Sequence, residues 1–337
     1  MFKIATTNLL TVIIALAASL LCGCQSNDNH YVVVEGTALG TFVQVKCSPT
    51  ITKSDIAEII HDIDNEAKES MSIFESSSLL SKINRNECDT LDSHILANLE
   101  LAKHYYELSN GYYDVTVKPL TSAWGFAQKS EKEEKPNVDS LLEFVGFDKL
   151  QIENGRLVKS DRRIQVDLNS IAKGYVVDLV AEELSKRGVE NYMVNIGGEI
   201  RCKGINGEGT DWHIGIETPY EGNFEQTSIE KIIPVSNCAV ATSGNYRRYY
   251  TSESGLKVCH TINPKTGYSV HSNLLSATVI AATCAEADAA ATMFMAMGSE
   301  GGALELAKRC EKEKGWSYYF IFADGNGYKV ESSQNIR

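Results

Sequence analysis

The 337-residue sequence predicts an α+β fold, with strands and helices in mixed order. Segments with alternating hydrophobic residues, typical of strands, and segments with helical spacing follow one another without the regular spacing of a doubly wound sheet. Hydrophobic residues make up 43% of the chain and charged residues 23%, which is the balance of a folded soluble protein. The length allows one large domain or two domains of roughly 150 residues each.

The first 23 residues are typical of a secretory signal peptide. They contain one early positive charge at Lys3 and an apolar run over residues 9–21, which is too short for a membrane-spanning helix. The letters LCG before Cys24 match a bacterial lipobox, in which the cysteine is acylated and becomes the new N-terminus. We therefore predict an exported lipoprotein, anchored in the membrane through Cys24 and facing the periplasm, with residues 24–30 as a polar tether. Ordinary signal cleavage without lipidation is the alternative.

The mature sequence begins with strands and a helix. Residues 31–46 alternate, are rich in β-branched residues and contain two glycines, which predicts two strands joined by a tight turn. Residues 54–69 place isoleucines at helical spacing, with Asp55 and Glu58 as a possible capping start.

Further along, helical spacing returns and then changes to mixed elements. Residues 93–109 predict a second helix, with Gly111 just beyond its end. The charged run at residues 129–136 predicts a solvated loop. The remaining predicted elements are a strand at 164–168, a helix at 171–187, a strand at 192–196, several strands between 212 and 279, helices at 285–297 and 302–311, and a strand at 318–322.

The cysteines give no metal or redox motif. Seven follow the predicted tether, at positions 47, 88, 202, 238, 259, 284 and 310. Their spacing is wide, no C-x-x-C occurs, and an odd number cannot all pair within one chain. We expect most of them to be small buried hydrophobic residues, and the sequence leaves their pairing open.

Charge and missing motifs exclude several function classes. The chain carries 32 basic and 44 acidic residues, a formal charge of −12, and no basic cluster of the kind that binds nucleic acid. The glycines of residues 204–209 do not have the spacing of a dinucleotide-binding turn, and no Walker A or H-E-x-x-H sequence occurs. Ser243 lacks the G-x-S-x-G context of a hydrolase. Any anionic ligand is therefore expected to be held by backbone amides, a metal or single basic side chains.

Two glycine-containing turns are candidate ligand sites. In DLNSIAKGYVVD, Asp167 ends a predicted strand and Lys173 lies in the first turn of a helix, where free N–H groups and a positive charge suit a phosphate. A helix start with a solvent-exposed lysine is an equal alternative. In VNIGGEI, Asn195, Gly197 and Gly198 end a strand and allow close approach of a ligand to the backbone, although a plain turn has the same pattern.

Two further segments carry polar side chains suited to catalysis. HTINPKTG begins with His260, and a single histidine is more often structural than catalytic. In EADAAATM, Asp288 and Thr292 lie four residues apart, on one face of a predicted helix. A carboxylate and a hydroxyl, completed by water and ligand phosphates, suit Mg²⁺, although Asp288 could instead be a buried helix-capping partner.

Together, eight segments in this order resemble the motifs of the ApbE family of flavin transferases. The segments are LGTFVQV (39–45), SIFESSSLLSKIN (72–84), GYYDVTVKPLTSAWGF (111–126), DLNSIAKGYVVD (167–178), VNIGGEI (194–200), TSGNYRRY (242–249), HTINPKTG (260–267) and EADAAAT (286–292). The resemblance implies a two-subdomain, T-shaped architecture over residues 31–337, with mixed, largely antiparallel sheets and flanking helices. It also implies Mg²⁺-dependent transfer of FMN from FAD to a Thr or Ser hydroxyl of a partner protein, through a phosphoester bond and with release of AMP.

The resemblance also implies roles for individual residues. His260 matches the histidine proposed as general base, while Asp288, Thr292 and the backbone carbonyl of Ala172 match the Mg²⁺ ligands. The positions matching FAD-binding segments are Leu39, Phe74, Asp114, Trp124, Lys173, Gly197, Gly198, Glu199, Thr242 and Ser243. This chain departs from the family pattern at Leu39, often Met; at Asn169 and Ser170, often Gly-Gly; and at Glu199, often Asp. These departures affect the expected packing of the flavin ring and the expected contacts of the FAD pyrophosphate.

The implied partners are FAD, acceptor flavoprotein subunits of exported electron-transfer complexes, and a membrane reached through the lipid anchor. Two other functions use the same residues. The chain could be a Mg²⁺-dependent pyrophosphatase that converts FAD to FMN and AMP, with water replacing the protein hydroxyl. It could also be a periplasmic flavin-binding lipoprotein without turnover, although a pure binder has no need of Asp288, Thr292 and His260 together.

Overall fold

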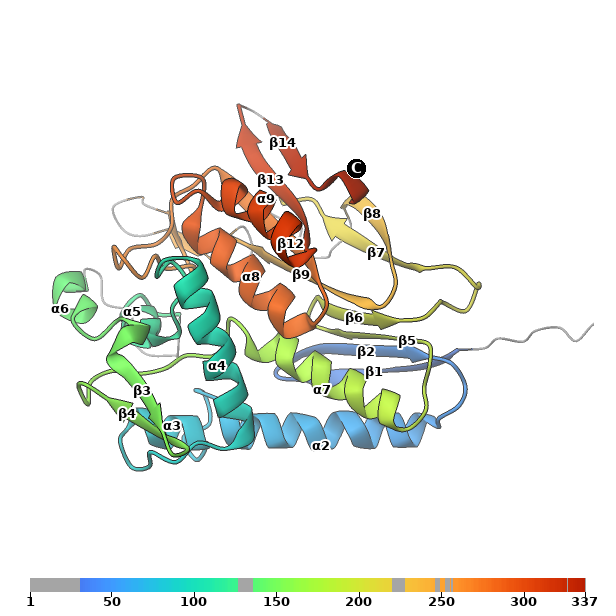
Figure 1. Cartoon of the computed structure of the whole chain (residues 1–337), viewed down its shortest axis with the longest axis horizontal. Helices are drawn as coiled ribbons and strands as arrows, with labels where there is room; N and C mark the ends of the chain where they lie inside the picture. Colours follow the sequence, from blue (N-terminus) through green and yellow to red (C-terminus); the bar gives the residue numbers. More distant parts are fainter. Residues whose placement is uncertain are drawn as a thin grey trace, which may run out of the picture. The chain divides into compact units, whose positions relative to one another are not determined.

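An eight-stranded antiparallel sheet organises the described part of the chain (Figure 1). The structure is a computed structural model and describes residues 31–126, 136–219, 228–245, 249–251, 255, 257–325 and 327–336. The predicted signal peptide, Cys24 and the tether lie outside these residues, as does nearly all of the predicted loop at 129–136. In spatial order the strands are β1 (Val32–Ala38), β2 (Thr41–Cys47), β5 (Tyr192–Ile196), β6 (Glu199–Lys203), β9 (Cys238–Gly244), β12 (Leu274–Ala281), β13 (Ser317–Asp324) and β14 (Gly327–Ser332).

Helices and three short two-stranded sheets complete the fold of the described residues, which is the α+β fold that the sequence predicts. The helices are α2 (Lys53–Met71), α3 (Leu79–Asn84), α4 (Ser93–Leu108), α5 (Lys118–Ala123), α6 (Val138–Leu142), α7 (Ala172–Lys186), α8 (Cys284–Met297) and α9 (Ala303–Lys314). The short sheets pair β3 (Leu150–Glu153) with β4 (Arg156–Lys159), β7 (Trp212–Glu217) with β8 (Ile229–Val235), and β10 (Tyr249–Thr251) with β11 (Lys257–Cys259).

Two details differ from the sequence prediction. The first long helix begins at Lys53, because the Thr52 side chain accepts a hydrogen bond from the Asp55 N–H and the Asp55 carboxylate accepts one from the Thr52 N–H. This reciprocal capping box lies three residues before the predicted pair of Asp55 and Glu58. The predicted strand at 164–168 is wrong. There the Asn84 side chain bonds both the N–H and the carbonyl of Val166, and so replaces a neighbouring strand.

The two faces of the sheet are covered differently. Helices α7 and α8 pack against one face through β5, β6, β9 and β12, as Figure 1 shows. On β5, Tyr192 and Val194 belong to this helix-side core, whereas Met193 between them belongs to a second core with Trp212 and Ile214 of the β7–β8 hairpin. The period-two alternation of a strand therefore gives each face its own core.

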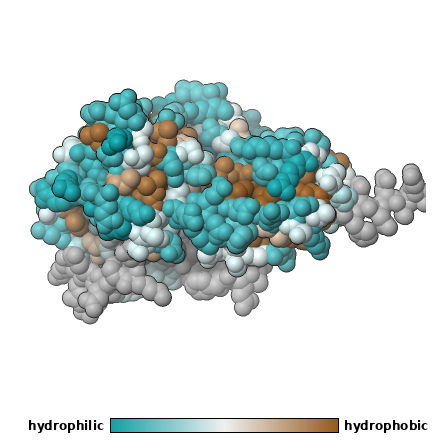
Figure 2. All heavy atoms as spheres, turned by 90° about the horizontal axis from the view of Figure 1, so that it is seen from below, coloured by the Kyte–Doolittle hydropathy of each residue, from teal (hydrophilic) through white to brown (hydrophobic). Residues whose placement is uncertain are grey.

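The face of the molecule that is seen from below is mostly polar (Figure 2). The view from below in Figure 2 shows mainly hydrophilic side chains, with hydrophobic ones gathered in smaller patches. Within the described ranges, no helix combines the length and the apolar character needed to cross a bilayer.

Helices α7 and α8 meet at Gly174. A Cβ atom built on Gly174 would lie 2.3 Å from the carbonyl oxygen of Cys284 and 2.8 Å from Cβ of Asp288. Real Cβ atoms do not approach backbone this closely, so any larger residue at this position must push the two helices apart. The glycine therefore sets how closely α7 approaches the residues of α8 that were singled out above.

We expect Gly174→Ala to lower the free energy of unfolding by about 3 kcal/mol, because overpacking against backbone outweighs the better helix propensity of alanine. Urea denaturation followed by circular dichroism measures the change. Gly36→Ala is the control, since a Cβ there would be 3.7 Å from Val43, an ordinary contact. If both variants are as stable as the parent chain, the inferred close packing of α7 against α8 at Gly174 is wrong.

Candidate active site

A cavity of about 550 Å³ opens where the turn between β5 and β6, the end of β9, and helices α7 and α8 come together. The segment at 260–264 and outward-facing residues of β7 form further parts of its wall. A volume of this size is typical of sites for organic ligands. The cavity therefore joins segments that are far apart in the sequence into one site.

This cavity is lined by ten of the residues that the sequence predicts to act in catalysis, cofactor binding or metal binding. They are Asp114, Lys173, Gly197, Gly198, Glu199, Thr242, Ser243, His260, Asp288 and Thr292. The structure thus brings together the candidate base, both side-chain candidates for metal binding and most of the predicted FAD-binding positions.

Four other predicted residues are not part of this lining. Leu39 lies in the turn between β1 and β2, where its N–H donates to the Asp64 carboxylate at 2.8 Å. Phe74 is 59% exposed, and the Trp124 ring is buried with its N–H donating to the Gly267 carbonyl. Ala172 is the first residue of α7, next to Lys173. Their roles toward flavin or metal stay predictions.

Acidic and basic side chains meet in the lining of the cavity. The Lys173 ammonium pairs with the Glu199 carboxylate and lies 3.9 Å from Oδ1 of Asp288. The backbone N–H of Gly174 donates to Oδ2 of Asp288 at 3.0 Å. Burial raises the pKa of Asp288 to about 7; Glu199 adds to this, while Lys173 and the Gly174 N–H oppose it. The protein therefore does not fully neutralise the negative charge of the ionised Asp288 carboxylate, and further positive charge in the cavity would stabilise it.

The oxygen atoms available as metal ligands in the cavity fit a hard divalent cation. Asp288 and Thr292 are one helical turn apart on α8, and the Thr292 hydroxyl is 3.1 Å from that of Ser243. Oε2 of Glu199 is buried with no hydrogen-bond partner in the described part of the chain. No group of three or more His, Cys, Asp or Glu side chains able to hold a metal occurs in that part. A cation here would therefore need hydroxyl, carbonyl, water and phosphate oxygens besides carboxylate, which is the donor set of Mg²⁺ rather than of zinc.

His260 lies on the wall of the same cavity, directly after β11. Its ring contacts that of Phe126 edge to face, with a centroid distance of 6.4 Å. The next residue, Thr261, donates its hydroxyl hydrogen bond to Asn245 at 2.6 Å, which ties this segment to the residues after β9. An imidazole in this position can accept a proton from a hydroxyl that enters the cavity.

Comparison with known proteins agrees with this geometry. Residues 39–319 match the model of the ApbE family. The chain belongs to the ApbE family. FAD:protein FMN transferase of Haemophilus influenzae is 36% identical over 98% of this chain and 97% of its own length. The protein of the same name from Vibrio cholerae is 36% identical over 86% of this chain and 88% of its own.

Solved ApbE structures share the fold. Flavin transferase ApbE from Vibrio cholerae superposes with a TM-score of 0.81 at 32% identity, covering 91% of this chain and 98% of that one. The apo form of the Pseudomonas stutzeri flavinyl transferase ApbE gives 0.80 at 28% identity, covering 90% and 95%. The ApbE family and the α+β fold predicted from the sequence are therefore confirmed.

Sequence reasoning missed one wall of the cavity in this ApbE chain. His213, Ile214, Gly215 and Glu217 of β7 line it, and Ile214 also packs with Trp212 and Ile216 in the hairpin-side core. The alternation of polar and apolar residues at 212–217 was the available signal. It predicts a strand with one polar face, but it does not reveal that this face borders a cavity.

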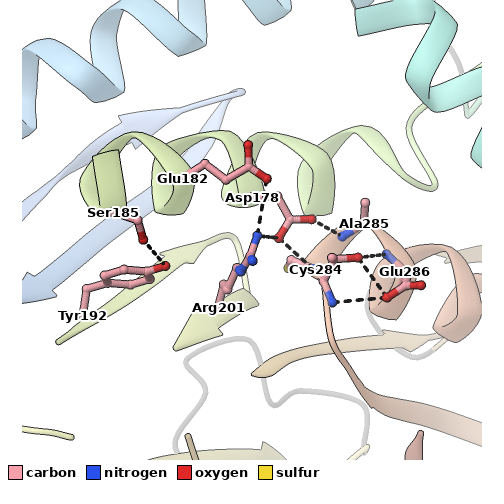
Figure 3. Close-up of polar contacts among 9 residues, drawn as sticks. Asp178, Glu182, Ser185, Tyr192, Arg201, Cys284, Ala285 and Glu286 are labelled. Atoms are coloured by element: carbon pink, nitrogen blue, oxygen red, sulfur yellow. Dashed lines mark hydrogen bonds and ion pairs between the residues drawn. The ribbon is translucent and has the colours of Figure 1, made fainter. Parts of the chain in front are cut away.

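A buried carboxylate fixes the start of the ApbE helix that carries Asp288. Figure 3 shows Asp178 of α7 between Arg201 of β6 and the first turn of α8. Its carboxylate accepts hydrogen bonds from the N–H groups of Cys284 and Ala285, each at 2.9 Å, and from Arg201 at 2.7 Å. Burial raises the pKa of Asp178, and these three donors oppose the rise. Asp178 therefore holds α8 in place relative to α7 and β6.

We expect Asp178→Asn to lower the free energy of unfolding by about 3 kcal/mol, because Arg201 loses its buried counter-charge and one helix N–H loses its acceptor. Chemical denaturation measures this loss. Glu182→Gln is the control, since Glu182 is also near Arg201, at 3.8 Å, but is 54% exposed, and we expect a change within about 0.5 kcal/mol. Equal stability of the two variants would show that Asp178 does not anchor α8.

Proposed function

We propose that this chain is a FAD:protein FMN transferase, which moves FMN from FAD to a Thr or Ser hydroxyl of a partner protein and releases AMP. One observation carries the proposal: His260, Lys173, Asp288 and Thr292 line a single cavity in a chain that matches a FAD:protein FMN transferase over 98% of its length. His260 supplies a proton acceptor, Lys173 a positive charge, and Asp288 with Thr292 a carboxylate–hydroxyl pair. These are the groups that phosphoryl transfer requires.

In the proposed reaction, His260 accepts the proton of the acceptor hydroxyl. The hydroxyl oxygen then bonds to the phosphorus atom of the FMN half, and the bond from that phosphorus to the bridging oxygen breaks. AMP leaves with the bridging oxygen. Lys173 contributes positive charge next to Asp288 and Glu199. Lys46 also lines the cavity.

Mg²⁺ is part of the proposal. Asp288, Thr292 and the carbonyl of Ala172 would hold it, and it would neutralise the pyrophosphate and stabilise the charge that develops on the leaving oxygen. The oxygen ligands that line the cavity support this assignment, as does Oε2 of Glu199, which has no hydrogen-bond partner among the described residues.

The proposed location is a membrane surface that faces the periplasm. The signal-peptide pattern of residues 1–23 and the lipobox before Cys24 support export and lipidation. The acceptors would then be exported flavoprotein subunits of electron-transfer complexes.

Release of AMP from FAD tests the proposed function. The purified chain is incubated with FAD and Mg²⁺, with and without an acceptor flavoprotein subunit, and AMP is measured by chromatography. We expect AMP to form mainly when the acceptor is present and to stop when EDTA is added. AMP formation at the same rate without acceptor would instead identify a FAD pyrophosphatase, and intact bound FAD would identify a flavin-binding protein.

A further inference from the structure

Two cysteines face each other across neighbouring strands of the sheet. In the antiparallel pairing of β6 with β9, Cys202 lies directly opposite Cys238. Directly opposed residues in such a pair have Cα atoms about 4.5 or 5.5 Å apart and side chains on the same face. Both spacings are within the roughly 4.4–6.8 Å range of disulfides. In the registers of the described strands, no other cysteine lies opposite a cysteine.

The surroundings of the pair suit a structural bond. Cys202 is 2% exposed within the hairpin-side core, and Cys238 is partly exposed and packs against the same core. Both are free thiols in this structure. Burial raises the pKa of each thiol, and neither is among the residues that line the cavity. The pair therefore lacks the low-pKa thiolate of a catalytic cysteine, while Cys238 remains accessible to a small oxidant.

The backbone next to the pair is already fixed. The Ser236 hydroxyl donates to the Gly204 carbonyl at 2.7 Å, and the Gly204 N–H donates to the Asn237 side chain at 3.2 Å. These contacts join the end of β6 to the start of β9. A bond between the two sulfur atoms would therefore need little movement of the strands, which limits its strain.

We propose that Cys202 and Cys238 form a cross-strand disulfide when the chain meets a disulfide oxidant. The Cys238 thiolate attacks glutathione disulfide, forms a mixed disulfide and releases one glutathione. The Cys202 thiol then loses its proton and displaces the second glutathione. Two protein thiols are oxidised to one disulfide, and one glutathione disulfide is reduced to two glutathiones.

The disulfide would close the chain around the β7–β8 hairpin. The segment between the two cysteines includes His213 and Glu217, which line the cavity. The strands it joins carry Glu199 at the start of β6 and Thr242 near the end of β9, both on the cavity. The bond would therefore link two walls of the site covalently, at a distance from the reacting groups.

Peptide mapping after controlled oxidation tests the proposal. The full chain is equilibrated with reduced and oxidised glutathione at several ratios, free thiols are alkylated, and the digest is examined by mass spectrometry without reduction. We expect a linked peptide pair containing Cys202 and Cys238, and a melting temperature several degrees above that of the reduced chain. Both effects should vanish in Cys238→Ser and persist in Cys88→Ser, whose thiol is also partly exposed.

Two results would overturn the proposal. One is alkylation of both thiols in the parent chain at glutathione ratios that oxidise ordinary structural cysteine pairs. The other is a linkage of Cys238 to a different cysteine. The mapping on the parent chain decides the question even if a serine variant fails to fold.

Discussion

Asp288→Asn is expected to lower Mg²⁺-dependent AMP release by roughly a thousandfold, the scale of losing one electrostatic stabiliser of a transition state. Asparagine has nearly the same shape and can still accept the hydrogen bond from the Gly174 N–H. What it removes is the negative charge that, with the Thr292 hydroxyl, is proposed to hold the cation. The rate is measured at saturating FAD over a range of Mg²⁺ concentrations.

The folded state should tolerate this change. Because burial raises the pKa of Asp288, its ionised form costs free energy in the absence of a cation, and a neutral amide avoids that cost. We expect the Asp288→Asn variant to be at least as stable as the parent chain in urea. Glu286→Gln is the control on the same helix, since glutamine keeps the capping contact to Thr283 and the side chain does not line the cavity. Undiminished AMP release in Asp288→Asn would refute the assigned cation site.

His260→Ala is expected to lower FMN transfer to the acceptor by about two to three orders of magnitude, as loss of a general base does. FAD binding should change by no more than a few-fold, because His260 is proposed to act on the acceptor hydroxyl. Transfer is measured as flavin fluorescence of the acceptor in a denaturing gel, and FAD binding by titration calorimetry.

His271→Ala provides the matched control, because this histidine is exposed and does not line the cavity. Its rate of transfer should equal that of the parent chain. If His260→Ala instead abolishes FAD binding, or leaves transfer unchanged, His260 is not the general base.

Local patterns predicted the elements of the fold where the local sequence decides their structure. The isoleucine spacing of α2 and the alternation of β1 and β2 are examples, and the structure contains all three elements. The apolar pattern at 164–168 wrongly predicted a strand, because strands and segments outside any sheet share this pattern. Contacts with distant residues decide between them: the Asn84 side chain bonds Val166, and the Asp167 N–H donates to the Val115 carbonyl.

The site was predictable where motifs carry the chemistry themselves. Asp288 and Thr292 are one helical turn apart, so their shared face follows from the sequence. The contribution of His213 and the anchoring by Asp178 depend on how the β7–β8 hairpin and α8 pack against distant elements. No local pattern encodes these contacts, which is why sequence reasoning did not find them.

The mass of an acceptor protein tests the central claim most directly. An exported flavoprotein subunit is incubated with this chain, FAD and Mg²⁺, and its intact mass is then measured, with fragmentation to locate any change. We expect the acceptor to gain one esterified FMN on a single Thr or Ser, and to gain nothing when Asp288→Asn replaces the parent chain. Appearance of free FMN and AMP with every tested acceptor unmodified would contradict the transferase assignment.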